Sequence, residues 1–100
     1  MRILLIEDDE KLGGQVAEQL KSSGYSVEWL QRGDVALEAD PAHYALIVLD
    51  LMLPGAFGLD ILKEYRRRSD TPIMVLSAKQ DATTKVRALE LGADDYVTKP

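Results

Sequence analysis

Three short apolar runs recur along the chain, and they limit its fold more than any other feature of the sequence. They are "RILLIE" (2–7), "ALIVLD" (45–50) and "PIMVLS" (72–77). Each run is apolar almost throughout instead of alternating with polar residues, which is typical of a strand buried on both faces of a sheet. These segments therefore predict the central strands of a sheet that is covered on both sides.

The segments around these runs complete an alternation of strands and helices. We expect further strands over 25–30 and 95–99, and helices over 9–24, 33–40, 59–68 and 81–92. Apolar strands joined through helices indicate a parallel sheet, and right-handed crossovers restrict it to a doubly wound α/β fold. A five-stranded version is expected to close with a helix after its last strand, and this sequence stops at Pro100 before one.

The first expected helix has a clear apolar face and an unexplained weakness. Leu12, Val16 and Leu20 recur at helical spacing and form that face. Gly13 and Gly14 each destabilise a helix by roughly 1 kcal/mol relative to alanine, and the sequence offers no reason for either of them.

Other expectations concern single positions in the helices. Asp9 is expected to cap the start of the first helix. In the last helix, Val86 and Leu89 are expected to face the sheet, and Gly92 is expected to end the helix. The arginine run 66–68 is expected to be a solvated helix face rather than a nucleic-acid patch.

The composition argues against several classes of protein. One hundred residues suit a single domain, and the lack of cysteine excludes disulfides and thiolate metal sites. The net charge of −5 argues against direct binding of nucleic acid. No apolar run approaches the roughly 18 residues of a membrane span, so we expect a soluble, cytoplasmic domain. The single histidine, His43, is expected in an exposed loop, and the single tryptophan, Trp29, is expected to serve packing.

Polar residues follow four of the five expected strands at their carboxyl ends, where ligands bind in such sheets. They are Glu7, Asp8, Asp9, Asp50, Ser77 and Lys99. If strands 2–7 and 45–50 are neighbours, their terminal carboxylates lie close together and resist ionising at the same time. A divalent cation would relieve this repulsion, and carboxylates without cysteine or a nearby histidine favour Mg²⁺ over zinc. The set fits phosphoryl transfer to an aspartate, with a hydroxyl and a lysine beside the metal.

Four motifs, taken together, resemble the successive signatures of two-component response-regulator receiver domains. They are "ILLIEDD", "LIVLDLMLPGAFG", "VLSAK" and "GADDYVTKP", and they span essentially the whole chain in the family's order. The last motif is most similar to the winged-helix, OmpR/PhoB-like transcription-factor subfamily. The resemblance implies a flavodoxin-like fold with sheet order 2-1-3-4-5. It also implies that residues 1–100 are a receiver domain without its fifth helix and without a DNA-binding output domain.

The resemblance implies a role for each residue of a phosphorylation site. Asp50 would be the phospho-acceptor and, with Asp8, a direct ligand of Mg²⁺, for which Mn²⁺ could substitute. Glu7 would contact the metal through water, and Met52 would contribute its backbone carbonyl. These four residues constitute the implied metal site.

The resemblance also implies a switch. Lys99 would pair with a phosphoryl oxygen, and the bond from Lys99 to Pro100 would be cis. Ser77 would follow the phosphoryl group, and Tyr96 would then turn inward. Charged residues of the last helix and strand would pair across a dimer formed on activation; in this sequence they are Lys85, Asp94 and Asp95.

The function implied is a signalling switch rather than an enzyme. A sensor histidine kinase would phosphorylate Asp50, and the change would control dimerisation and an output domain that alone contacts DNA. Two alternatives remain at this point. One is an aspartate-nucleophile phosphohydrolase, which would want a second acid where Met52 stands. The other is a non-phosphorylated pseudo-receiver used only for protein contacts, although the acceptor, the acids and the lysine are all present.

Overall fold

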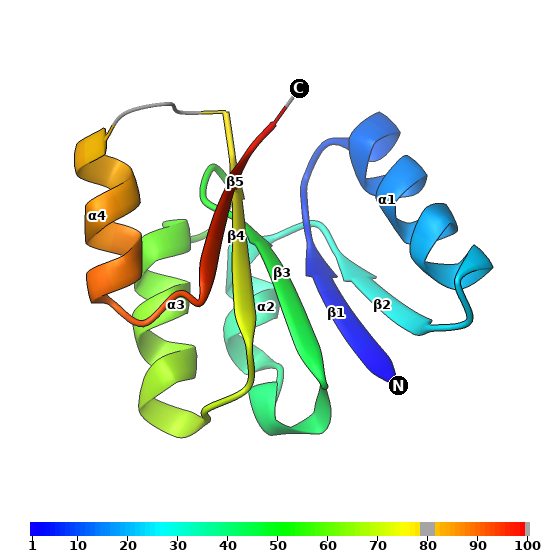
Figure 1. Ribbon diagram of the computed structural model, residues 1–100, viewed down its shortest axis with the longest axis horizontal. Helices are drawn as coiled ribbons and strands as arrows, with labels where there is room; N and C mark the ends of the chain where they lie inside the picture. Colours follow the sequence, from blue (N-terminus) through cyan, green and yellow to red (C-terminus); the bar gives the residue numbers. More distant parts are fainter. Residues whose placement is uncertain (79–81, 100) are drawn as a thin grey trace.

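The protein folds around a five-stranded parallel sheet of order β2-β1-β3-β4-β5, seen in a computed structural model that describes residues 1–78 and 82–99 (Figure 1). The strands are β1 (Arg2–Ile6), β2 (Ser26–Leu30), β3 (Leu46–Asp50), β4 (Ile73–Ser77) and β5 (Asp95–Thr98). The helices are α1 (Glu10–Ser22), α2 (Gly33–Glu38), α3 (Gly58–Arg68) and α4 (Ala82–Glu90), with a 3-10 turn, η1 (Pro41–His43). The predicted doubly wound α/β fold is confirmed.

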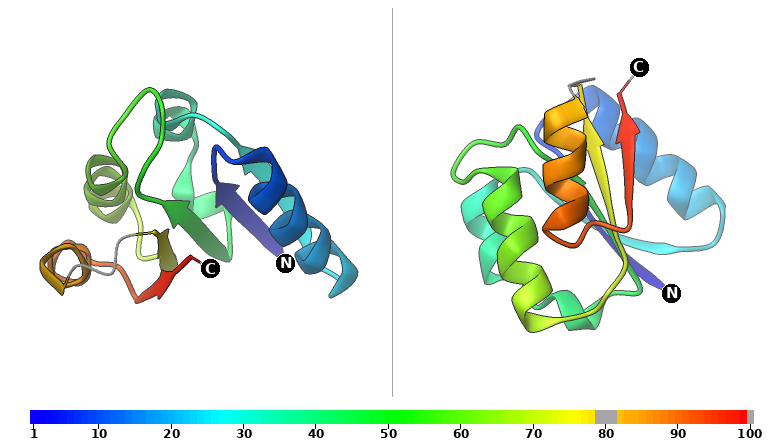
Figure 2. Two further views of the ribbon diagram at one scale, coloured as in Figure 1. Left: turned by 90° about the horizontal axis from the view of Figure 1, so that it is seen from above. Right: turned by 60° about the vertical axis from the view of Figure 1, so that its left-hand side comes forward.

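Helices lie on both faces of the sheet, as the apolar strands require. In Figure 2, α1 lies on one side and α2, α3 and α4 lie on the other. Side chains of β1 alternate between the two cores, with Leu4 and Ile6 packing towards α3, and Ile3 and Leu5 packing towards α1. None of the helices within residues 1–78 and 82–99 is long and apolar enough to cross a membrane.

The structure supplies the reason for Gly13 that the sequence lacks. The indole ring of Trp29 lies against this glycine, and a Cβ at position 13 would stand 2.2 Å from ring atom Cζ2. A Cβ at Gly14 would instead stand 4.0 Å from the nearest ring atom, which is an ordinary van der Waals distance. The close approach of β2 to α1 therefore requires a glycine at the first position but not at the second.

Alanine substitutions at these two glycines are expected to have opposite effects on stability. Gly13→Ala should lower the free energy of unfolding by about 1–3 kcal/mol, because the overlap with the indole outweighs the better helix propensity. Gly14→Ala should raise it by about 0.5–1 kcal/mol, because propensity acts there without a clash. Urea unfolding of both variants measures this difference, and a stabilising Gly13→Ala would contradict the packing argument.

The predicted inward face of α4 is wrong. Val86 and Leu89 are 52% and 42% exposed, whereas Ala88 is completely buried. Val86 and Leu89 lie on one side of this short helix and Ala88 lies on another, so the apolar residues alone permit two inward faces. The side with the small residue is the one that packs into the core, in the same cluster as Ala93 and Tyr96. Gly92 ends the helix with a φ of 111°, as predicted.

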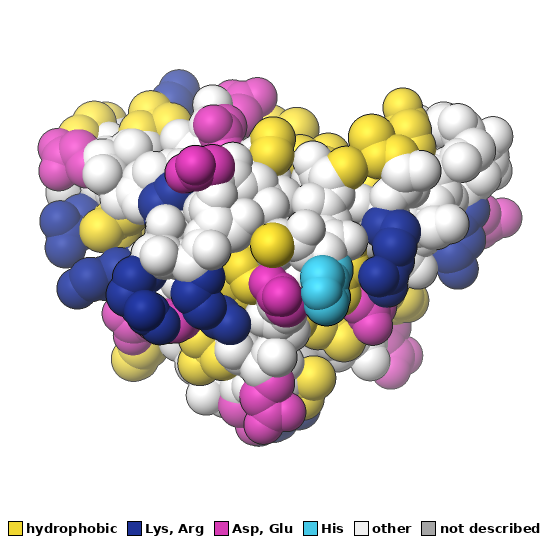
Figure 3. Space-filling view, turned by 90° about the horizontal axis from the view of Figure 1, so that it is seen from below, with side chains coloured by type: hydrophobic (Ala, Val, Ile, Leu, Met, Phe, Trp, Pro, Cys, Tyr) yellow, Lys and Arg dark blue, Asp and Glu magenta, His cyan; other side chains and the backbone are white. Residues whose placement is uncertain are grey.

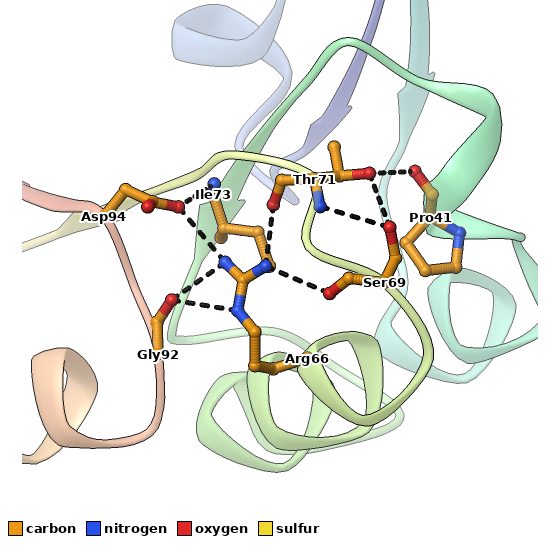
Figure 4. Close-up of polar contacts among 7 residues, drawn as sticks. All are labelled: Pro41, Arg66, Ser69, Thr71, Ile73, Gly92 and Asp94. Atoms are coloured by element: carbon orange, nitrogen blue, oxygen red, sulfur yellow. Dashed lines mark hydrogen bonds and ion pairs between the residues drawn. The ribbon is translucent and has the colours of Figure 1, made fainter.

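The prediction that Arg66 lies on a solvated helix face is wrong. Its guanidinium group contacts the backbone and a carboxylate of neighbouring segments (Figure 4). Its Nε and Nη2 donate to the carbonyl oxygen of Gly92 at 3.0 and 2.8 Å. Nη1 donates to the carbonyl oxygens of Ser69 and Thr71 at 3.0 Å each. Nη2 also meets a carboxylate oxygen of Asp94 at 3.1 Å. Arg66 thus ties the end of α3 to the start of β4 and to the turn between α4 and β5.

Replacing Arg66 with lysine is expected to lower the free energy of unfolding by about 2 kcal/mol, because a single ammonium group leaves several of these carbonyl oxygens unpaired. Arg67→Lys is the matched control, since Arg67 is exposed and pairs only with Glu64 among the described residues. It should leave the urea midpoint almost unchanged. Equal midpoints for the two variants would show that the Arg66 contacts contribute nothing.

Candidate functional site

Three acidic side chains meet at the carboxyl edge of the sheet, which is the upper edge in Figure 1. Glu7 and Asp8 follow β1, and Asp50 ends the neighbouring strand β3. One carboxylate oxygen of each of these residues lies within 4.8 Å of one from each of the other two. The structure therefore brings together the acids that the sequence placed at separate strand ends.

Asp50 is almost completely buried, with 1% of its surface exposed. An ionised carboxylate in such a place is costly unless it is paired and hydrogen-bonded. The ammonium group of Lys99 lies 3.0 Å from Oδ2, and the backbone N–H of Met52 donates to Oδ1 at 3.1 Å. These two contacts offset the cost of burial and hold the carboxylate in one orientation.

Glu7 is completely buried beside Asp50. Burial raises the pKa of Glu7 to about 7, with a further increase from Asp50, although Lys99 and the backbone N–H of Asp9 act in the opposite direction. Its Oε2 accepts the N–H of Asp9 at 3.1 Å. Its Oε1 forms an ion pair with Lys99 at 2.9 Å, but accepts no hydrogen bond of favourable geometry within residues 1–78 and 82–99. The buried Oε1 of Glu7 can therefore accept a hydrogen bond from a further donor.

Lys99 is the cation that faces this cluster among the described residues. Burial alone would lower the pKa of Lys99, but its close contacts with the Glu7 and Asp50 carboxylates outweigh burial and raise that pKa. The cluster contains three carboxylates, Glu7, Asp8 and Asp50, and the single ammonium group of Lys99 pairs with two of them. The excess of acid, together with the spare oxygen of Glu7, fits a divalent cation held by oxygen ligands.

The two residues predicted to form the switch lie on the adjacent strands β4 and β5. Ser77 is completely buried at the end of β4, one position beyond the residue that pairs with Asp50 across the sheet. Its carbonyl oxygen accepts the backbone N–H of Lys99 at 2.7 Å. Tyr96 of β5 is 9% exposed and packs in the core shared with α3 and α4. The predicted cis bond after Lys99 involves Pro100, which lies outside the described residues.

The loop after β3 is held close to Asp50. The side chain of Met52 is exposed, so this residue faces the cluster through its backbone, which already donates to Asp50. A Cβ at Gly58 would stand 2.4 Å from the Cα of Leu51, so only glycine lets α3 begin this close to the loop. No pattern in the sequence indicates this contact, which depends on how α3 packs against the loop. A role for the Met52 carbonyl as a metal ligand stays a prediction.

An open pocket of about 740 Å³ lies beside Asp8. Its walls include Met52 and Phe57 from the loop after β3, and Thr84 from α4. Asp8 is the residue of the acidic cluster that lines this pocket. His43, in contrast, is exposed on η1, at the opposite edge of the molecule (Figure 3), as predicted.

The residues predicted for a dimer interface lie on α4 (Lys85), on β5 (Asp95) and in the turn between these two elements (Asp94). Lys85 and Asp95 are exposed. Asp94 is exposed too, but its Oδ2 accepts the backbone N–H of Ile73 at 2.8 Å as well as the contact from Arg66. This carboxylate therefore has a role within the chain, which the sequence did not reveal. The dimer itself stays a prediction.

A model of the response regulator receiver domain matches residues 3–100 of this chain. The chain therefore belongs to the receiver domain family. It is 44% identical over 101 residues to the transcriptional activator protein IrlR of Burkholderia pseudomallei, a match that covers 100% of this chain and 44% of that protein. The chain spans less than half the length of the curated relatives that it matches.

Solved structures show the same fold. The BeF₃-activated N-terminal receiver domain of RstA from Klebsiella pneumoniae has a TM-score of 0.92 and 31% identity, covering 100% of this chain and 88% of that one. A response regulator from Burkholderia pseudomallei has a TM-score of 0.90 and 33% identity, covering 99% of this chain and 59% of that one. That structure contains a phosphorylated aspartic acid, a calcium ion and citrate.

Proposed function

We propose that this chain is the phosphorylation switch of a two-component transcription regulator. The observation that carries the proposal is the cluster itself: three carboxylates within 4.8 Å of one another, with Lys99 3.0 Å from the buried Asp50. The phosphorylated aspartic acid in the structurally similar Burkholderia pseudomallei regulator supports it. The alternatives of a phosphohydrolase and a pseudo-receiver gain no support from the family match.

The residues of the cluster fit Mg²⁺, with Mn²⁺ as a substitute. Asp8 and Asp50 would bind the ion directly, Glu7 through a water molecule, and Met52 through its backbone carbonyl. The calcium ion in the Burkholderia pseudomallei structure is consistent with a divalent cation here. When bound, the cation supplies positive charge that stabilises the phosphoryl oxygens during transfer.

The phosphoryl donor is a phosphohistidine of a sensor kinase. An oxygen of Asp50 forms a bond to phosphorus while the bond from phosphorus to the histidine nitrogen breaks, and that nitrogen keeps the electron pair. Lys99 exchanges its contact with the Asp50 carboxylate for one with a phosphoryl oxygen, and the Ser77 hydroxyl hydrogen-bonds another. The chain acts only on itself, so it is a switch rather than an enzyme.

Phosphorylation biases the domain between two conformations. Ser77 moves towards the phosphoryl group and Tyr96 occupies the space that it leaves. The face formed by α4 and β5 then pairs with a second copy through Lys85, Asp94 and Asp95. A separate output domain, which alone contacts DNA, reads this change in the cytoplasm.

Incubation with a small acyl phosphate tests the proposal. Mass spectrometry should show the addition of one phosphoryl group in Mg²⁺ and none in excess chelator. The modified peptide should contain residue 50. Sustained hydrolysis of a generic phosphate ester would instead favour the phosphohydrolase, and no modification at all would favour the pseudo-receiver.

The metal site has its own expected result. Trp29 donates a hydrogen bond to the backbone oxygen of Glu7 at 2.8 Å, so its fluorescence should respond when a cation binds beside Asp8. Asp8→Ala should abolish the response to Mg²⁺, because it removes a charged ligand. Asp60→Ala, an exposed acid on the rim of the pocket, is the control and should retain the response. Unchanged Mg²⁺ affinity in Asp8→Ala would refute Asp8 as a ligand.

A further inference from the structure

The side chain of Trp29 reaches from β2 to the backbone of the acidic turn. Its indole N–H donates to the carbonyl oxygen of Glu7 at 2.8 Å. The backbone N–H of Glu7 in turn donates to the carbonyl oxygen of Leu30 at 3.0 Å. Both backbone polar groups of Glu7 are thus bonded to consecutive residues of β2.

The residues after Asp8 are held just as firmly. The N–H of Asp9 donates to the Glu7 carboxylate at 3.1 Å. The Asp9 carboxylate accepts the N–H of Leu12 at 3.0 Å and caps α1. Asp8 therefore lies between two residues, Glu7 and Asp9, that are held by hydrogen bonds. Among these hydrogen bonds, the one from Trp29 is donated by a side chain of β2.

Gly13 makes room for this arrangement. A Cβ at that position would stand 2.2–2.9 Å from three atoms of the indole, including Nε1. Any larger residue would push the ring away and move its N–H from the Glu7 oxygen. The glycine lies in the same helix that Asp9 caps, so α1 and β2 together fix where the indole lies.

We propose that Trp29 is a positioning residue for the cation site, and that its N–H holds the turn 7–9 in the shape that presents Asp8 to the metal. A ligand held in place before binding loses less conformational freedom when the cation arrives. Without the N–H, the Glu7 carbonyl loses a bond and the turn samples other shapes. The inference rests on the proposed function, because it assumes that Asp8 is a metal ligand.

The test removes the N–H while keeping the shape of the ring. Trp29 is the only tryptophan, so growth with 3-benzothienylalanine replaces the indole nitrogen with sulfur at this site alone. Mn²⁺ affinity, measured from the electron paramagnetic resonance signal of the free ion, should fall about three- to tenfold. Incorporation of 5-fluorotryptophan, which keeps the N–H, should leave the affinity unchanged.

Two further variants distinguish a positioning role of Trp29 from a general effect on stability, one as a control and one as a second test. Arg66→Lys weakens the fold at the opposite edge of the sheet and should keep full Mn²⁺ affinity. Gly13→Ala displaces the indole and should weaken binding as the sulfur analogue does. Full affinity in the sulfur analogue, while Asp8→Ala binds no Mn²⁺, would overturn the role of Trp29 and leave the proposed function intact. Failure of the unmodified protein to bind Mn²⁺ would overturn both.

Discussion

The Asp50→Asn variant is expected to take up no phosphoryl group from an acyl phosphate in Mg²⁺, while it folds at least as stably as the wild type. The amide has nearly the same shape as the carboxylate but is a far weaker nucleophile. Its oxygen can still accept a hydrogen bond from Lys99. Removing the charge also removes an interaction that raises the pKa of Glu7, so the buried cluster loses repulsion. Intact-mass spectrometry and urea unfolding of the same sample measure both results.

Asp60→Asn provides the matched control for this experiment. Asp60 lies in the first turn of α3 and borders the pocket beside Asp8, but it is exposed and outside the acidic cluster. Its variant should be phosphorylated to the wild-type extent. A phosphoryl group that persists in Asp50→Asn would assign the acceptor to another residue.

Lys99→Met is expected to cause the largest loss of stability among the substitutions considered. The variant leaves Glu7 and Asp50 buried without their shared cation, and breaking a buried ion pair in this way costs about 3–5 kcal/mol. The loss should be found at pH 8 without divalent cations. Lys63→Met, on the exposed side of α3, is the control and should change the urea midpoint little.

The loss in Lys99→Met should also depend on pH. The pKa of Glu7 is about 7 in the folded chain against an ordinary value of 4.5, so the folded state keeps a proton that the unfolded state releases. Stability therefore falls as the pH rises from about 4.5 to about 7. Without Lys99 the pKa of Glu7 rises further and the fall continues above pH 7. The gap between variant and wild type should widen from pH 5 to pH 8, and a constant gap would show that Glu7 does not titrate this way.

The elements that the sequence predicted correctly are those with local signals. The strands β1, β3 and β4 can be predicted without knowing which strands lie beside them, because a buried strand must be apolar on both sides. The acids and the lysine were found from the rule that parallel strands place their carboxyl ends at one edge. Asp9 as a helix cap was predicted from its residue type and position, and the structure confirms it.

The residues whose environment was predicted wrongly from the sequence have contact partners that are distant in the sequence. Arg66 was expected in solvent, yet its acceptor at Gly92 is 26 residues away in sequence. Val86 and Leu89 were expected to form the inward face of the last helix, whereas Ala88 is the residue of α4 that is buried. No periodicity in either helix contains this information.

The sequence by itself determined the fold class and the chemistry at the sheet edge, because burial on both faces and strand-end position are local properties of the chain. Only the tertiary structure decided how that chemistry is held in place. Lys99 lies between two buried carboxylates, and Trp29 fits over Gly13 to reach the backbone of Glu7. These contacts join strands and helices that are distant in sequence, and their geometry follows from how closely those elements pack.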